Sequence, residues 1–264
     1  MTGPTTGARA GCLLRAPRED AALRLLCFHH AGGGASFFAP WPARVPPGVE
    51  VVPVQLPGRE SRFREPRCHD AGALAETLAA ELGPHLDRPY AVYGHSMGAL
   101  VGFATVAALL RAGGPAPLAL YVGAYAAPHL TPPLPPADLC GDAELARLLV
   151  DIGGLHPRFL GRADWLRALL PVLRDDLRIC AGHRDAGLPE PGDAERRAPF
   201  GITAFAGADD RLVDPGAVAA WRLYADEFRL VTVEGGHFFP REAPEPFFAE
   251  LGASLAALLP AARP

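Results

Sequence analysis

Short apolar runs alternate along this chain with longer stretches in which apolar residues recur three or four positions apart. The short runs are typical of buried strands, and the longer spacing is typical of amphipathic helices. The predicted strands lie at 23–28, 49–56, 91–93, 118–122, 202–206 and 229–233. The predicted helices lie at 37–43, 71–86, 99–110, 143–151, 162–179, 217–228 and 244–259. Strands that alternate with helices indicate an α/β fold with a mainly parallel sheet and helices on both faces.

Two segments depart from this alternation. Residues 1–20 are rich in Gly, Pro, Thr and Arg and are expected to form a flexible N-terminal tail, although residues 12–14 could add an edge strand. Residues 126–195 begin with a proline-rich stretch and contain helical patterns but no convincing strand. We interpret them as a helical lid inserted into one domain that spans 21–264; a separate small domain is the alternative. Within the second predicted strand, Pro53 indicates a position near the sheet edge or a bulge.

Composition narrows the function classes. A chain of 264 residues with 49% hydrophobic residues can bury one substantial core. A net charge of −4 without a basic patch speaks against nucleic-acid binding, and no apolar run is long enough to span a membrane. The five scattered cysteines form no C-x-x-C pair, and the first ten residues lack a signal-peptide pattern. We therefore expect neither a metal nor a disulfide, and a cytoplasmic location.

The candidate nucleophile is Ser96, in the stretch Gly94-His95-Ser96-Met97-Gly98. This stretch fits G-x-S-x-G and lies between a predicted buried strand and a predicted apolar helix. Such a strand-to-helix turn is tight, because a side chain at either flanking glycine would collide with a neighbouring element. It holds the central residue in a strained conformation with its hydroxyl exposed. A glycine-rich turn without catalytic function is the alternative interpretation.

A serine nucleophile needs a base within hydrogen-bonding reach and an acid that orients the base. Of the nine histidines, His237 is the preferred base, because it follows the last predicted strand and completes the order Ser, Asp, His. The other histidines are interpreted as solvated or packed side chains. Asp210 is the preferred acid, in a Gly-x-x-Asp turn after a strand, and Asp209 and Asp214 remain alternatives.

Attack on an acyl carbonyl also needs backbone N–H donors for the oxyanion that forms. Met97, the residue after the nucleophile, is predicted to supply one donor at the start of its helix. The second is expected from the glycine-rich loop after the first predicted strand, from Ala31, with Gly32 as the next choice. A phosphate-binding turn is the other interpretation of residues 30–33, but neither G-x-x-x-x-G-K-[ST] nor G-x-G-x-x-G accompanies it. The residues thus predict acyl transfer to water through an acyl-serine intermediate.

Together these segments resemble the α/β-hydrolase superfamily and, more narrowly, the type II (editing) thioesterases that accompany polyketide synthases and non-ribosomal peptide synthetases. The stretches that carry the resemblance are 26–33 (LCFHHAGG), 55–63 (QLPGRESRF), 94–99 (GHSMGA), 173–176 (LRDD), 207–210 (GADD) and 236–239 (GHFF). The resemblance covers residues 23–259. Three departures concern substrate preference and lid motion: His29 replaces the family's proline, and residues 122–128 and 181–195 differ from its usual segments.

The resemblance implies hydrolysis of acyl thioesters from the phosphopantetheine arm of acyl-carrier or peptidyl-carrier domains. It implies removal of aberrant acyl groups in polyketide or non-ribosomal peptide biosynthesis, with no cofactor and no metal. Carrier domains are the expected partners, without nucleic acid or membrane, and we expect a monomer. The alternatives are a medium-chain fatty-acyl or acyl-CoA thioesterase or esterase, and a non-catalytic binding partner. The complete Ser, Asp and His set argues against the last.

Overall fold

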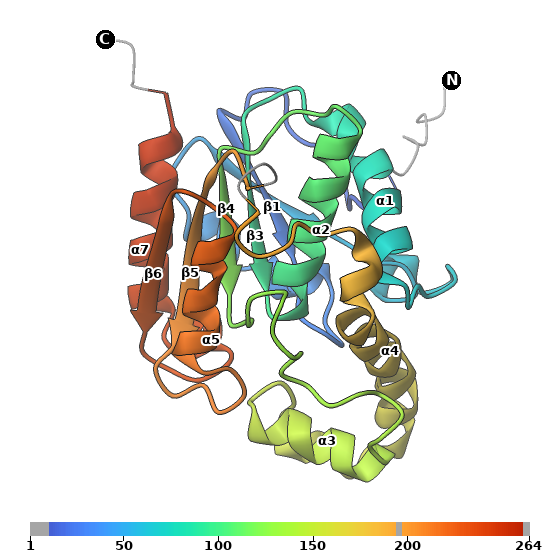
Figure 1. Ribbon diagram of the computed structural model, residues 1–264. Coiled ribbons are helices and arrows are strands. Elements are labelled where there is room, and N and C mark those ends of the chain that lie inside the picture. Colours follow the sequence, from blue (N-terminus) through green and yellow to red (C-terminus); the bar gives the residue numbers. More distant parts are fainter. Residues whose placement is uncertain (1–10, 194–196, 261–264) are drawn as a thin grey trace, which may run out of the picture.

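Six strands form a single parallel sheet in the computed structural model, which describes residues 11–193 and 197–260 (Figure 1). The strands are β1 (Leu23–Phe28), β2 (Val49–Val54), β3 (Tyr90–His95), β4 (Ala119–Gly123), β5 (Gly201–Gly207) and β6 (Phe228–Val233). Their order in the sheet is β2-β1-β3-β4-β5-β6, and neighbouring strands are parallel. The predicted α/β architecture is confirmed.

Helices cover both faces of the sheet. The α-helices are α1 (Ala71–Leu82), α2 (Met97–Arg111), α3 (Asp142–Asp151), α4 (Ala163–Ala181), α5 (Pro215–Ala219), α6 (Phe239–Glu242) and α7 (Pro244–Leu258). The 3₁₀ turns include η1 (Ala35–Phe38), η2 (Trp41–Ala43) and η7 (Ala220–Leu223). α1 and α2 pack on one face, and α7 packs on the other with η1 and η2 (Figure 1). Side chains alternate along β3, so Val92 packs in the core under α1 and α2, and Tyr93 packs in the core under α7, η1 and η2. This burial on both faces explains why the strands are continuous apolar runs.

Three predicted helices are shorter than expected. The helix expected at 71–86 is α1 followed by a 3₁₀ turn at Gly83–His85. The helix expected at 37–43 is split into η1 and η2, because Pro40 and Pro42 lack the N–H that a continuous helix needs. The helix expected at 217–228 is α5 followed by η7, and Phe228 already belongs to β6. The side chain of Asp214 caps α5 by accepting a hydrogen bond from the N–H of Gly216 at 2.7 Å.

The N-terminal segment packs against the edge strand β2. Pro53 lies in this strand, which confirms its predicted edge position. Leu13 forms an isolated antiparallel bridge to Val54. Cys12 and Leu13 are buried, so these two residues pack into the core where a flexible tail was expected, because apolar side chains there cover the sheet edge. Residues 1–10 of the expected tail lie outside the described residues.

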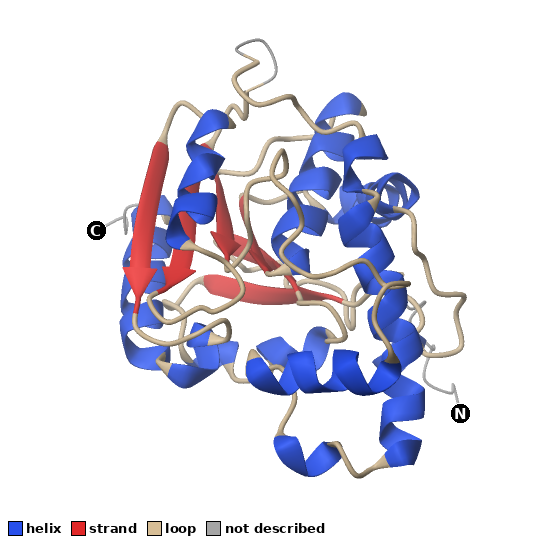
Figure 2. Cartoon of the chain, turned by 60° about the horizontal axis from the view of Figure 1, so that its bottom comes forward, coloured by secondary structure: helices blue, strands red, loops and turns tan. Residues whose placement is uncertain are grey.

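The segment between β4 and β5 carries α3 and α4. Both helices lie at the end of the sheet toward which the strand arrows point (Figure 1), and Figure 2 shows this end turned forward. Leu170, Leu173 and Leu177 of α4 are buried in the core that includes α1 and α2. The insertion therefore covers the carboxyl ends of the strands, where functional side chains of a parallel sheet gather. No helix among the described residues is long and apolar enough to cross a membrane.

Candidate active site

The turn between β3 and α2 holds Ser96 in a strained conformation. Ser96 is the single residue between the two elements, with φ 53° and ψ −124°. A Cβ on Gly94 would lie 2.2 Å from the carbonyl oxygen of Gly98, and a Cβ on Gly98 would lie 2.1 Å from the carbonyl oxygen of Phe28. Both glycines are therefore required by close backbone packing, as the sequence predicted. A positive φ in a residue with a side chain is strained and is characteristic of functional sites.

Ser96, His237 and Asp210 form one chain of hydrogen bonds. His237 Nε2 lies 3.0 Å from Ser96 Oγ, and His237 Nδ1 lies 2.8 Å from Asp210 Oδ2. Because the carboxylate accepts a hydrogen bond from Nδ1–H, the neutral ring presents a lone pair at Nε2 to the serine hydroxyl. The side chains of His237 and Asp210 are only 2% and 1% exposed, so bulk water does not compete for these bonds. This geometry allows proton transfer from Ser96 to His237.

The structure distinguishes the three candidate acids. Asp210 Oδ1 accepts hydrogen bonds from the N–H groups of Leu212 and Val213 at 2.8 and 3.1 Å, which leaves Oδ2 for His237. Asp214 caps α5, and Asp209 is exposed. Of the three, only Asp210 contacts the histidine.

His95, interpreted from the sequence as a solvated or packed side chain, supports the loop that carries His237. Its Nε2 donates to the carbonyl oxygen of His237 at 2.9 Å, and its Nδ1 accepts from the hydroxyl of Tyr93 at 2.9 Å. Burial, with a smaller contribution from the proximity of the His237 ring, lowers the pKa of His95 well below its usual value. A neutral His95 therefore holds the backbone of the loop that carries His237. Its place beside Ser96 in the motif is the signal that could have identified it.

Both predicted oxyanion donors lie close to Ser96 in the fold. Met97 is the first residue of α2, and Ala31 is buried in the turn after β1. Ala31 and Ser96 line the same small cavity. The N–H of Gly32, the alternative donor, is already bound to Asp176 Oδ2 at 2.7 Å. This contact favours Ala31 over Gly32 for the oxyanion.

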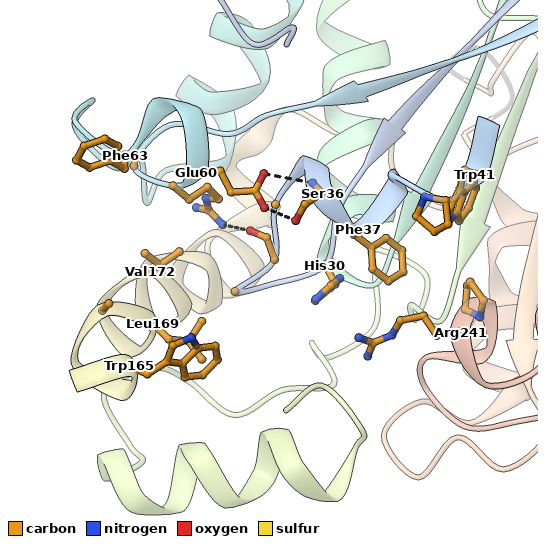
Figure 3. A pocket seen from close by; sticks show the side chains of 18 of the residues that line it. His30, Ser36, Phe37, Trp41, Glu60, Phe63, Trp165, Leu169, Val172 and Arg241 are labelled. Atoms are coloured by element: carbon orange, nitrogen blue, oxygen red, sulfur yellow. Dashed lines mark hydrogen bonds between the residues drawn. The ribbon is translucent and has the colours of Figure 1, made fainter. Parts of the chain in front are cut away.

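Two adjoining cavities open at this end of the sheet. The smaller has a volume of about 160 Å³ and includes Ser96 and His237, with a mainly apolar wall of Ala31, Leu134, Leu149, Ile152, Trp165, Leu169 and Phe238. The larger has a volume of about 840 Å³ and shares His30, Gly32, Trp165 and Leu169 with the smaller. Figure 3 shows Trp165, Leu169 and Val172 of α4 on one side of the larger cavity and His30, Phe37 and Arg241 on another. In residues 11–193 and 197–260, no group of three or more His, Cys, Asp or Glu side chains could hold a metal ion.

His30 lies where the two cavities meet. Its ring packs edge-on against Phe37 and Phe238, with centroid distances of 4.9 and 4.8 Å. Burial lowers the pKa of His30 well below its usual value, and the proximity of the His95 ring adds to this effect. The passage between the cavities is therefore lined by aromatic rings, and the Arg241 guanidinium lies over the rings of Phe37 and Phe238.

Comparison with known proteins gives consistent matches over most of the chain. The family model described as "Thioesterase domain" matches residues 23–255. The solved structure of the RedJ thioesterase from the prodiginine biosynthetic pathway of Streptomyces coelicolor is 39% identical, with a TM-score of 0.80 over 88% of this chain and 90% of that one. YbtT, a type II thioesterase from the yersiniabactin NRPS/PKS pathway, is 29% identical, with a TM-score of 0.75 over 90% and 94% of the two chains. The human medium-chain S-acyl fatty acid synthase thioesterase is 30% identical over 86% of this chain and 84% of the relative.

Proposed function

Because this chain belongs to the thioesterase family, we propose that it hydrolyses acyl thioesters carried on the phosphopantetheine arm of acyl-carrier or peptidyl-carrier domains. The observation that carries this proposal is the hydrogen-bonded chain of Ser96, His237 and Asp210 beside the two cavities. We assign Ser96 as nucleophile, His237 as general base and then general acid, and Asp210 as the residue that orients the imidazole.

In the first half of the reaction, Ser96 Oγ attacks the thioester carbonyl while His237 Nε2 takes the hydroxyl proton. The N–H groups of Met97 and Ala31 donate to the oxyanion of the tetrahedral intermediate. The C–S bond then breaks, and His237 returns the proton to the departing thiol. In the second half, His237 takes a proton from water, which attacks the acyl-serine, and the acid is released as Ser96 recovers its proton.

The cavities support a division of the substrate into two parts. The smaller cavity adjoins Ser96 and is mainly apolar, so it suits the acyl group. The larger one adjoins it and is lined by residues from η1 to α4, so we assign it to the arm. Because α4 lines both cavities, we propose that the 126–195 segment acts as a lid whose position controls access to Ser96.

Two named relatives support a role in polyketide or non-ribosomal peptide biosynthesis, where the enzyme would remove aberrant acyl groups. RedJ belongs to the prodiginine pathway and YbtT to an NRPS/PKS pathway. The second candidate function is a medium-chain fatty-acyl thioesterase, which the human relative supports. The small volume beside Ser96, about 160 Å³, favours the first candidate, because a medium-length chain needs more space.

The test compares one acyl group on three leaving groups: a propionyl-loaded carrier domain, propionyl-CoA and p-nitrophenyl propionate. We expect the carrier substrate to have the highest kcat/KM, by about tenfold or more. Equal values on the carrier and on CoA would refute the carrier assignment. Ser96→Ala should abolish turnover and the acyl-enzyme adduct in intact-mass spectra, whereas Ser61→Ala, at an exposed serine, should leave both unchanged. Turnover by Ser96→Ala near the wild-type rate would refute the nucleophile.

A further inference from the structure

We infer that Arg59 and Asp176 are positioning residues for the oxyanion site: they hold the turn that carries Ala31, and Arg59 neutralises a carboxylate that would otherwise oppose the oxyanion. This inference rests on the proposed function of Ser96 as nucleophile. It does not depend on which thioester is the natural substrate.

The pair joins three segments that are distant in sequence. Arg59 follows β2, Asp176 lies on α4, and Gly32 lies in the turn after β1. Arg59 Nη1 and Nη2 donate to the two oxygens of Asp176 at 2.6 and 2.8 Å, and the N–H of Gly32 donates to Asp176 Oδ2 at 2.7 Å. Arg59 is 7% exposed and Asp176 is fully buried. A buried ion pair of this kind is costly to desolvate, so stability alone gives little reason to keep it.

The contacts bear directly on the turn that supplies the second oxyanion donor. Asp176 accepts from the N–H of Gly32, which belongs to the peptide immediately after Ala31. The carbonyl oxygen of Gly33 lies 3.5 Å from Arg59 Nη1, and the N–H of Gly33 donates to the carbonyl oxygen of His30 at 3.0 Å. The turn is therefore held from outside and from within. Since an oxyanion donor acts only from a fixed position, loosening this turn weakens donation by Ala31.

The charge of Asp176 gives the pair a second effect. Its carboxylate accepts a hydrogen bond from Gly32, the residue after Ala31. Gly32 lines the cavity that contains Ser96. A negative charge there would raise the energy of the oxyanion, and weak screening in a buried site would strengthen this effect. The bidentate guanidinium cancels that charge. Removing Arg59 alone should therefore harm catalysis more than removing both partners.

The chain offers a matched control on the same helix. Asp175 precedes Asp176 on α4 and pairs with Arg67 at 2.6 Å and with Arg178 at 2.8 Å. It thus also ties α4 to the loop after β2, and Arg67 is 43% exposed. No hydrogen bond links Asp175 to the described residues of the 30–33 turn. If the pair at Asp176 served only to hold α4 in place, loss of Asp175 would have a similar effect.

The experiment uses p-nitrophenyl propionate, which has no pantetheine arm, and measures kcat, KM and the Ki of propylboronic acid, which forms a tetrahedral adduct with an active serine. Arg59→Met should lower kcat about 100-fold with KM little changed, and should raise the Ki of propylboronic acid by a similar factor. The double variant Arg59→Met/Asp176→Leu should recover at least about tenfold in kcat over Arg59→Met. Asp175→Asn should keep wild-type kcat and Ki.

Several results would overturn the inference. They are an Arg59→Met enzyme with wild-type kcat, a double variant no better than Arg59→Met, and an Asp175→Asn loss as large as that of Arg59→Met. If Arg59→Met does not fold, as judged by circular dichroism, Arg59→Lys replaces it. Lysine keeps the charge but loses the bidentate contact, so kcat should fall by no more than about tenfold, and a 100-fold loss in a folded Arg59→Lys enzyme would refute neutralisation as the dominant effect. Loss of carrier preference would refute only the proposed substrate, since the aryl ester does not report on it.

Discussion

Acidification is predicted to destabilise this protein through three buried histidines near the active site. The pKa of His29 is lowered to about 4, mainly by burial and then by the charge on Arg59. Burial also lowers the pKa values of His30 and His95 well below the ordinary 6.5. In the unfolded chain these side chains bind protons as the pH falls below 6.5, whereas in the folded protein they stay neutral. The unfolded state therefore binds more protons, and the free energy of unfolding falls with decreasing pH.

The magnitude follows from His29, whose pKa in the folded protein is about 4. Each pKa unit corresponds to about 1.4 kcal/mol, so the pH interval from 6.5 to 5 removes about 2 kcal/mol through His29. His30 and His95 act in the same direction. The loss begins below pH 6.5 and is complete below the folded-state pKa values. A decrease of this size is a substantial part of the about 5–15 kcal/mol that stabilises a typical domain.

The assay is urea unfolding followed by circular dichroism at pH 7.5, 6.5, 5.5 and 5. His29→Gln should reduce the difference between pH 7.5 and pH 5 by about 2 kcal/mol. His69→Gln is the matched control, because His69 is exposed and should leave the pH dependence unchanged. A wild-type free energy of unfolding that stays constant between pH 7.5 and pH 5 would refute the reasoning. An unchanged pH dependence in His29→Gln would refute the contribution of that residue.

Two further predictions concern catalysis. Asp210→Asn should lower kcat about 10⁴-fold in steady-state assays, because an amide facing His237 Nδ1 favours the wrong tautomer; Asp209→Asn should stay near wild type, and an equal loss in the two variants would contradict the assignment of the acid. The acyl cavity of about 160 Å³ is much smaller than the adjoining cavity of about 840 Å³, so propionyl and butyryl esters should exceed decanoyl esters in kcat/KM. Leu149→Ala should shift this preference toward longer chains, and a wild-type preference for decanoyl would contradict the estimate.

The sequence predicted the sheet and the serine turn because both depend on local patterns. Apolar runs identify strands that are buried on both faces, and G-x-S-x-G between a strand and a helix identifies Ser96. The break in the helix predicted at 37–43 was also visible in the local sequence, because Pro40 and Pro42 interrupt it. Secondary structure at this level follows from the chain itself.

The contacts around the site could not be predicted in the same way. The Gly-x-x-Asp spacing favoured Asp210 but left the adjacent Asp209 open, and only the fold shows which carboxylate turns toward His237. His95 acts through a backbone carbonyl 142 positions away. Arg59 and Asp176 are 117 residues apart, and nothing in the sequence indicates that these two charges form a buried pair. Each depends on tertiary packing, where side-chain direction decides function.

The glycine contacts at positions 94 and 98 have a consequence for redesign. Ser96 is placed by one stretch of main chain touching another, since a Cβ at position 98 would lie only 2.1 Å from the carbonyl oxygen of Phe28. The reactive hydroxyl therefore stays in register without help from the side chains of Leu134, Leu149 and Ile152, which wall the acyl cavity. Libraries that vary those three positions can test new acyl groups while the Ser96 hydroxyl keeps its position. A methyl group at either glycine would displace that hydroxyl.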